Sequence, residues 1–151
     1  MEEMTGGVAG TDDLCRLIYV SRNLLEGPAE AVEQEVFRIL EVSRRNNLRD
    51  GITGALLFST DYFAQALEGP PAAVHRAFER IQCDARHSGT VVLSCGNVPA
   101  REFGEWSMAY VGRVQAEGTR YATLAMPQAA EHESRRVLNM LHGVVERSST
   151  A

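Results

Sequence analysis

Apolar and polar residues recur with two different periods along this chain, and the periods predict five strands and three helices. Dense apolar and β-branched runs are typical of strands, whereas apolar residues spaced three and four apart are typical of helices. The predicted strands are Leu14–Ser21, Gly54–Ser59, Tyr62–Leu67, Thr90–Cys95 and Trp106–Val111. The predicted helices run from Ala29 to Asn46, from Gly69 through Cys83, and within Glu131–Arg147.

The order of these elements indicates an α+β fold of the ferredoxin-like class. A βαββαβ series with an additional strand predicts a five-stranded mixed sheet with two helices on one face. The other face must also be covered, and Val137, Leu141, Val144 and Val145 share one side of the last predicted helix. We therefore expect this C-terminal helix on the second face of the sheet, or against a second subunit.

The chain divides into three parts. Residues 1–13 are polar and glycine-containing, which is typical of a flexible N-terminal arm. Residues 14–112 carry the predicted sheet and form one domain, and residues 113–151 form a helical extension. The length of 151 residues is that of one ordinary domain, and no output enzyme fits into the extension.

Charge, hydropathy and cysteine content limit the environment and the partners. A net charge of −5 disfavours nucleic acid as the main partner. We expect a cytoplasmic protein without membrane contact, because the sequence has neither a membrane-spanning apolar run nor a signal peptide. Cys15, Cys83 and Cys95 are odd in number and scattered, which fits a reducing compartment and predicts no metal site.

The common enzyme signatures are missing from the sequence. There is no Walker loop, dinucleotide fingerprint, Cys-x-x-Cys pair, His-Glu-x-x-His motif or Gly-x-Ser-x-Gly elbow. None of the four histidines has an obvious carboxylate partner. These absences favour a binding or signalling domain over an enzyme.

Hydrogen-bonding side chains lie in rows that are otherwise apolar. Gln65 shares a strand face with Phe63 and Leu67, because side chains alternate along a strand. A buried glutamine must satisfy two donors and two acceptor lone pairs. The phenol of Tyr19 could be a partner, and so could a flat heteroaromatic ligand, although a glutamine in a strand is more often solvated or bound within the protein.

Other polar and aromatic residues could have purely structural roles as well. Trp106 and Met108 share a predicted face with Tyr110, and such a pair usually serves packing. Asn46 and Asn47 at the end of a predicted helix could form its C-terminal cap and turn.

Taken together, these residues resemble the BLUF family of flavin-binding photoreceptors, from about Leu14 to Gly112. The resemblance rests on LIYVS, RRNNLRDGITGALLF, YFAQALEG, AFERIQCDARHS and FGEWSMAYV, in this order. It implies a non-covalently bound flavin, FAD with FMN as the alternative. In the family, the tyrosine matching Tyr19 donates an electron and a proton to the excited flavin, and the glutamine matching Gln65 rearranges its hydrogen bonds.

The resemblance also implies the residues that contact the flavin. Asn47 matches the residue at one carbonyl edge of the ring, with Asn46 as a second contact and Ile81 against the face of the ring. Asp84, Arg86 and His87 match positions near the opposite edge or the flavin side chain. Trp106 and Met108 match the strand that follows the glutamine switch and relays the signal.

The implied function is a short stand-alone blue-light sensor and not an enzyme. Its signal would pass to an unidentified downstream protein, and a homo-oligomer is expected. Two other readings stay open at this point: a ferredoxin-like flavin enzyme or small-molecule regulatory domain without a light response, and a purely structural oligomerisation module.

Overall fold

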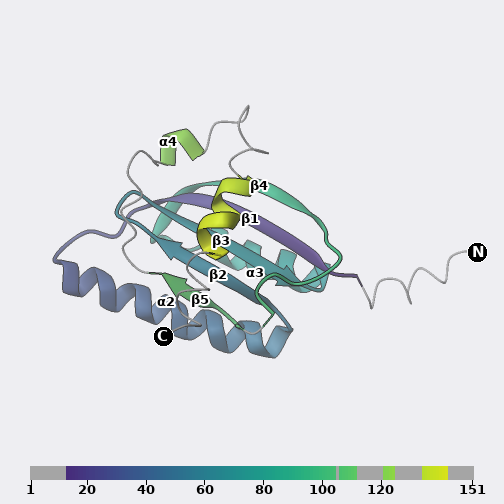
Figure 1. Cartoon of the computed structure of the whole chain (residues 1–151). Helices are drawn as coiled ribbons and strands as arrows, with labels where there is room; N and C mark the ends of the chain where they lie inside the picture. Colours follow the sequence, from purple (N-terminus) through teal and green to yellow (C-terminus); the bar gives the residue numbers. More distant parts are fainter. Residues whose placement is uncertain (1–12, 105, 112–120, 125–133, 143–151) are drawn as a thin grey trace, which may run out of the picture.

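The computed structural model describes residues 13–104, 106–111, 121–124 and 134–142. The elements with assigned labels are β1 (Cys15–Asn23), α2 (Ala29–Asp50), β2 (Thr53–Phe58), β3 (Tyr62–Gly69), α3 (Pro71–Gln82), β4 (His87–Asn97), β5 (Ala109–Val111) and α4 (Tyr121–Leu124). A further helix spans residues 134–142. In Figure 1, α2 and α3 lie on one side of the sheet and the helix at 134–142 lies on the other.

The expected mixed sheet of five full strands is wrong. The body of the sheet is four antiparallel strands in the order β4-β1-β3-β2. Of the predicted strand Trp106–Val111, only the three-residue β5 joins the sheet, at the edge and parallel to β2. The reason lies in α2, whose Asn47 and Arg44 side chains bind the carbonyl oxygens of Ser107 and Met108. The segment before β5 is therefore held by side chains of α2 and by one backbone bond from β2, in which Gly54 N–H donates to the Trp106 carbonyl oxygen at 3.1 Å.

Each face of the sheet carries its own apolar core. The helix-side core lies between the sheet and the helices α2 and α3, and it includes Leu17, Leu40, Leu56, Leu67, Val74 and Met108. The second-face core includes Ile18, Val20, Leu57, Phe103, Val137 and Leu141. Val137 and Leu141 come from the helix at 134–142, whereas Val144 and Val145 lie outside the described residues.

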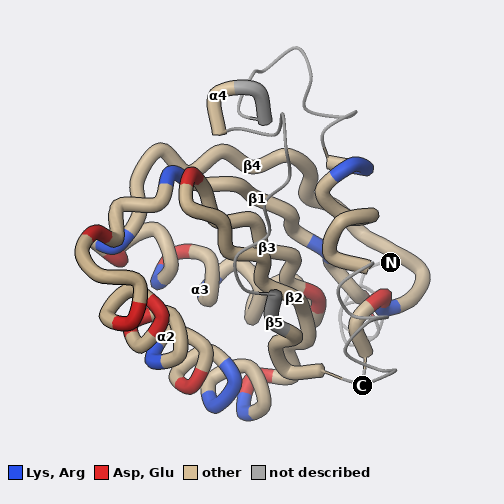
Figure 2. Tube along the Cα trace, turned by 60° about the vertical axis from the view of Figure 1, so that its left-hand side comes forward, with Lys and Arg blue, Asp and Glu red and all other residues tan. Residues whose placement is uncertain are grey.

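Helix α2 is longer than the sequence pattern predicts. It continues to Asp50 and ends at Gly51, whose φ of 74° is the left-handed conformation that glycine adopts readily. Asn46 and Asn47 are therefore interior helical residues and do not form the cap. Acidic residues predominate in the first half of α2 and arginines in the second half, and both signs are visible along it in Figure 2.

A buried carboxylate fixes the connection between β4 and β5. Glu68, at the end of β3, is fully buried and accepts hydrogen bonds from the backbone N–H groups of Glu102 (2.7 Å) and Phe103 (3.0 Å). The guanidinium of Arg16 on β1 balances its charge at 3.0 Å. This cluster holds the turn that leads into Trp106–Met108.

No helix in the described part of the chain is long and apolar enough to cross a membrane. The short helix α4 has no counterpart among the predicted elements. It lies near β4, since the Tyr121 hydroxyl donates a hydrogen bond to the carbonyl oxygen of Gly89.

Candidate functional site: a cavity between two helices and the sheet

A phenol and an amide face each other at the centre of the sheet. Tyr19 on β1 is directly opposite Gln65 on β3 in the antiparallel register. Both side chains point to the helix side and are almost fully buried, with exposed fractions of 3% and 4%. The Tyr19 O–H donates a hydrogen bond to Gln65 Oε1.

The other end of the Gln65 amide reaches the segment before β5. Gln65 Nε2 donates to the sulfur of Met108 at 3.5 Å. Met108 is itself buried in the helix-side core, and its carbonyl oxygen accepts from Arg44 Nε at 3.0 Å. A thioether is a weak acceptor, so this second contact is weaker than the Tyr19 contact. The amide thus joins β1 to the start of β5 through two bonds of unequal strength.

Tyr19 remains a neutral hydrogen-bond donor at ordinary pH. Burial, followed by the negative charge of Asp84, raises the pKa of the Tyr19 phenol well above its usual range. Its ring packs against Phe78 of α3, with 5.4 Å between the ring centroids. The phenol therefore keeps its proton and donates it in the hydrogen bond to Gln65 Oε1.

Beside this pair lies a cavity of about 210 Å³ between α2, α3 and the sheet. Its wall contains eight residues that the sequence singles out: Tyr19, Asn46, Asn47, Gln65, Ile81, Asp84, Arg86 and His87. Exposed residues such as Val42 and Arg80 also line it, so the cavity opens to solvent between the two helices. Ile39, Leu56, Phe63 and Ile81 supply apolar wall around the polar groups. An apolar slot with a few converging polar side chains suits a flat heteroaromatic ring.

The two neighbouring asparagines have different environments. Asn47 is buried, and its Nδ2 donates to the Ser107 carbonyl oxygen at 2.8 Å. Asn46 is half-buried, and its amide makes no hydrogen bond to the part of the chain that the structure describes. Asn46 is therefore free to bind a ligand, whereas Asn47 also fixes the segment before β5.

His87 lines the cavity without offering a free ring nitrogen. Its Nδ1 lies 2.6 Å from Ser21 Oγ, and its Nε2 lies 2.6 Å from the carbonyl oxygen of Ile81. Because a carbonyl only accepts, Nε2 carries the proton and Nδ1 accepts from the serine hydroxyl. The ring can form a wall, but neither nitrogen is available to a ligand.

Asp84 and Arg86 form an ion network on the same wall. The Arg86 guanidinium bonds Asp84 at 2.6 Å and Glu35 of α2 at 3.0 Å. Hydrogen bonding from Arg86 lowers the pKa of Asp84 below its usual range. The network ties α2 to the turn after α3 beside the cavity.

Trp106 and Met108 do not share a face, contrary to the sequence prediction. Met108 belongs to the helix-side core, while Trp106 packs against the second-face core. Neither lines the cavity. The alternation rule fails here because residues 106–108 form no strand.

Sequence reasoning missed one side of the cavity. Ile39, Val42 and Ser43 line it together with Asn46 and Asn47, all from α2. Their spacing of three and four residues is the helical period, so the predicted helix already contained this stripe, but the sequence gives no sign that its residues line a cavity. Arg44 and Glu35 were missed because their partners come from distant parts of the chain.

A protein-family comparison identifies this arrangement. The model described as "Sensors of blue-light using FAD" matches residues 14–109, which include every cavity residue named above. The chain belongs to the BLUF family. The resemblance seen in the sequence is confirmed, and the chain is a blue-light photoreceptor that uses a flavin.

Known BLUF proteins resemble the chain in sequence and in fold. The blue light- and temperature-regulated antirepressor BluF of Escherichia coli is 37% identical over 95 residues, which cover 63% of this chain and 23% of BluF. The solved dark-state structure of BlrB, "a BLUF protein", is 32% identical, with a TM-score of 0.66 over 85% of this chain and 96% of BlrB. The photo-activated state of BlsA is 31% identical, with a TM-score of 0.70 over 85% of this chain and 94% of BlsA.

The shared BLUF region is a sensor and not an enzyme, as expected. The photoactivated adenylate cyclase subunit alpha of Euglena gracilis is 32% identical over 103 residues, and the match spans only 10% of that protein. This chain therefore spans less than a quarter of the length of these two curated relatives.

Proposed function

We propose that light acts on this chain through Gln65, whose amide gives up its hydrogen bonds to Tyr19 and Met108 and binds the flavin carbonyl more strongly, which shifts the flavin absorption to the red. The observation that supports the proposal is the two-ended contact of one buried amide, Oε1 with the phenol and Nε2 with the thioether. No other described side chain bonds both Tyr19 and the segment before β5.

The cavity residues fit a flavin, FAD in the first place and FMN as the alternative. Asn46 would bind a polar edge of the ring, Ile81 would pack on its face, and Asp84 and Arg86 would lie toward its side chain. Asn47 would share its amide between ring and Ser107, and His87 would contribute its ring as a wall. When bound, the flavin supplies blue-light absorption and an excited ring that accepts an electron and a proton.

Tyr19 is the donor in this proposal, and Gln65 is the switch. A glutamine amide presents an acceptor at one end and donors at the other. If the amide turns or tautomerises, Oε1 no longer accepts from Tyr19 and the Nε2–Met108 contact is lost. The two arrangements use the same pocket and differ in a few hydrogen bonds, which is the kind of bistable element that a switch requires.

The signal would leave the pocket through the segment Ser107–Met108. Its carbonyl oxygens are bound by Asn47 and Arg44, and it continues into β5 at the edge of the sheet. We propose that a change at Met108 alters β5 and the C-terminal helix, and that a downstream protein recognises the altered surface. The antirepressor relative illustrates a sensor that acts on another protein. We further propose that the protein is a cytoplasmic homo-oligomer that contacts neither nucleic acid nor membrane directly.

The test is a light-minus-dark absorption spectrum of the purified protein, followed by affinity capture in the dark and under blue light. The protein should be yellow, and its flavin band should shift reversibly to the red. A partner should be captured in one light state only. An unchanged flavin spectrum under blue light would contradict the proposed switch, and mass spectrometry of the released cofactor separates FAD from FMN.

A further inference from the structure

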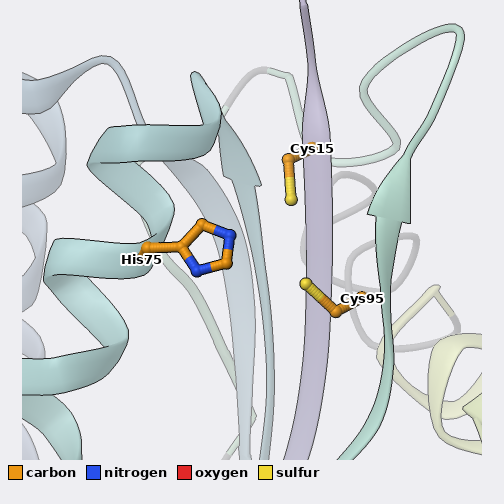
Figure 3. A group of neighbouring side chains, drawn as sticks. All are labelled: Cys15, His75 and Cys95. Atoms are coloured by element: carbon orange, nitrogen blue, oxygen red, sulfur yellow. The ribbon is translucent and has the colours of Figure 1, made fainter.

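Three side chains with metal-binding atoms meet outside the flavin cavity. Cys15 of β1, Cys95 of β4 and His75 of α3 approach one another between the helix and the sheet (Figure 3). None of the three lines the cavity. Figure 3 shows both sulfur atoms and the His75 ring directed to the same space.

The fold brings these residues together from positions far apart in the sequence. Cys95 pairs with Leu17 in the β1–β4 ladder, while Cys15 lies two residues earlier on β1. Residues opposite each other or two apart share a face of an antiparallel pair, so both sulfurs lie on the helix side of the sheet. His75 is near the start of α3, which packs over β1.

The distances leave room for one metal ion. The ligand atoms of the three residues all lie within 4.8 Å of one another. Zn²⁺ holds sulfur at about 2.3 Å and imidazole nitrogen at about 2.0–2.1 Å, so its ligand atoms lie roughly 3.3–3.8 Å apart. His75 and Cys95 are exposed, so small rotations of their side chains can shorten the distances between the ligand atoms to these values.

Cys15 is the buried member of the cluster, and its sulfur has a backbone partner. The backbone N–H of Gly96 donates a hydrogen bond to this sulfur. A donor of this kind can orient a metal-bound thiolate from outside the coordination sphere. His75 and Cys95 are exposed, so an ion and a water ligand can reach the cluster from solvent.

We propose that Cys15, Cys95 and His75 bind one Zn²⁺ ion, with water as the fourth ligand. Two thiolates and one imidazole are soft and borderline ligands that suit Zn²⁺, and their charge balances that of the ion. Both thiol protons pass to solvent on binding, and no electron is transferred. The ion would join α3 to β1 and β4. This site does not depend on the proposed Gln65 switch.

The test is zinc titration of the flavin-loaded protein against a chromophoric chelator, with a non-thiol reductant present. The wild-type protein should bind one Zn²⁺ per chain. Cys95→Ser and His75→Ala should each weaken binding at least about 100-fold, since the loss of even an outer-shell partner costs about 10–100-fold. Both residues are exposed, so the variants should fold, and an unchanged flavin spectrum verifies this.

Cys83→Ser is the matched control, because Cys83 is an exposed free cysteine outside the cluster. It should bind zinc like the wild type. Substitution by Co²⁺ should give visible d–d bands of tetrahedral intensity, which Cys95→Ser should lose. Two results would each overturn the proposal: no stoichiometric zinc binding by the wild-type protein, or equal weakening by Cys83→Ser.

Discussion

Among single residues, the proposed function depends most directly on Tyr19 and Gln65. An amide buried without partners would cost about 1–3 kcal/mol, so its position in an apolar row requires specific contacts. The alternation of side chains along the two strands was enough to predict that both residues face the core. Their direct opposition in the register depends on β3 pairing with β1, which strand periodicity alone does not reveal.

Tyr19→Phe should keep the flavin bound and abolish the stable red-shifted state. Phenylalanine preserves the ring that packs on Phe78 but removes the proton that Gln65 accepts. The measurement is a light-minus-dark spectrum at equal flavin occupancy. A photocycle of wild-type size in this variant would assign the donor role to another residue.

Tyr62→Phe provides the control for this substitution. Tyr62 is a buried tyrosine of the second-face core, and its hydroxyl has no hydrogen-bond partner in the described part of the chain. Removing an unpaired buried hydroxyl should leave stability unchanged or raise it slightly. The Tyr62→Phe protein should retain the full light response.

At the scale of elements, α2 connects the cavity to the segment before β5. The periodic spacing of its apolar and charged residues predicted the helix correctly. It did not predict where the helix ends, because Asn46 and Asn47 are also residue types that form the C-terminal cap of a helix. The true end depends on Gly51, which adopts the left-handed conformation four residues after Asn47. The sequence pattern also predicted too long a strand β5. The carbonyl oxygens of Ser107 and Met108, which a longer β5 would contain, are bound by side chains of α2.

The sequence analysis also did not predict the cluster of Cys15, His75 and Cys95, because the cluster depends on how the elements pack. The sequence predicted no metal site because Cys15, His75 and Cys95 have no metal-ligand spacing. Each residue comes from a different element, and the three come together because β4 pairs with β1 and α3 packs over β1.

The two asparagines of α2 should respond differently to alanine. Asn47→Ala removes the bond to Ser107, so it should lower the free energy of unfolding of the flavin-free protein by about 1–2 kcal/mol. Asn46→Ala breaks no hydrogen bond of the described chain, so it should weaken flavin binding with less effect on stability. Urea unfolding without flavin and flavin titration of both variants measure the two effects. Equal destabilisation by the two substitutions would contradict the different roles.

In the whole molecule, the two apolar cores have different roles on the two faces of the sheet. The helix-side core surrounds the cavity, and the second-face core joins the sheet to the helix at 134–142 through Val137 and Leu141. The apolar stripe of this helix was predictable from its period, because an amphipathic helix must bury its apolar side.

Leu141→Ala should destabilise the protein without changing the flavin spectrum. The side chain is fully buried, and a leucine-to-alanine change in a core costs about 2–5 kcal/mol. Asn139→Ala is the control, because Asn139 is an exposed residue of the same helix. Chemical unfolding compares their stabilities. A Leu141→Ala protein as stable as the control would show that this helix does not cover the sheet in solution.

The central claim is that Gln65 is the switch, and the light-minus-dark spectrum of Gln65→Leu tests it most directly. Leucine is close in size and apolar, so the cavity should still bind flavin and the protein should be yellow. Gln82→Leu makes the same change at an exposed position of α3 and should keep the wild-type red shift. The account predicts no red shift in Gln65→Leu at full flavin occupancy, because no side chain remains that can redirect a hydrogen bond to the flavin carbonyl. A red shift of wild-type size in that variant would contradict it.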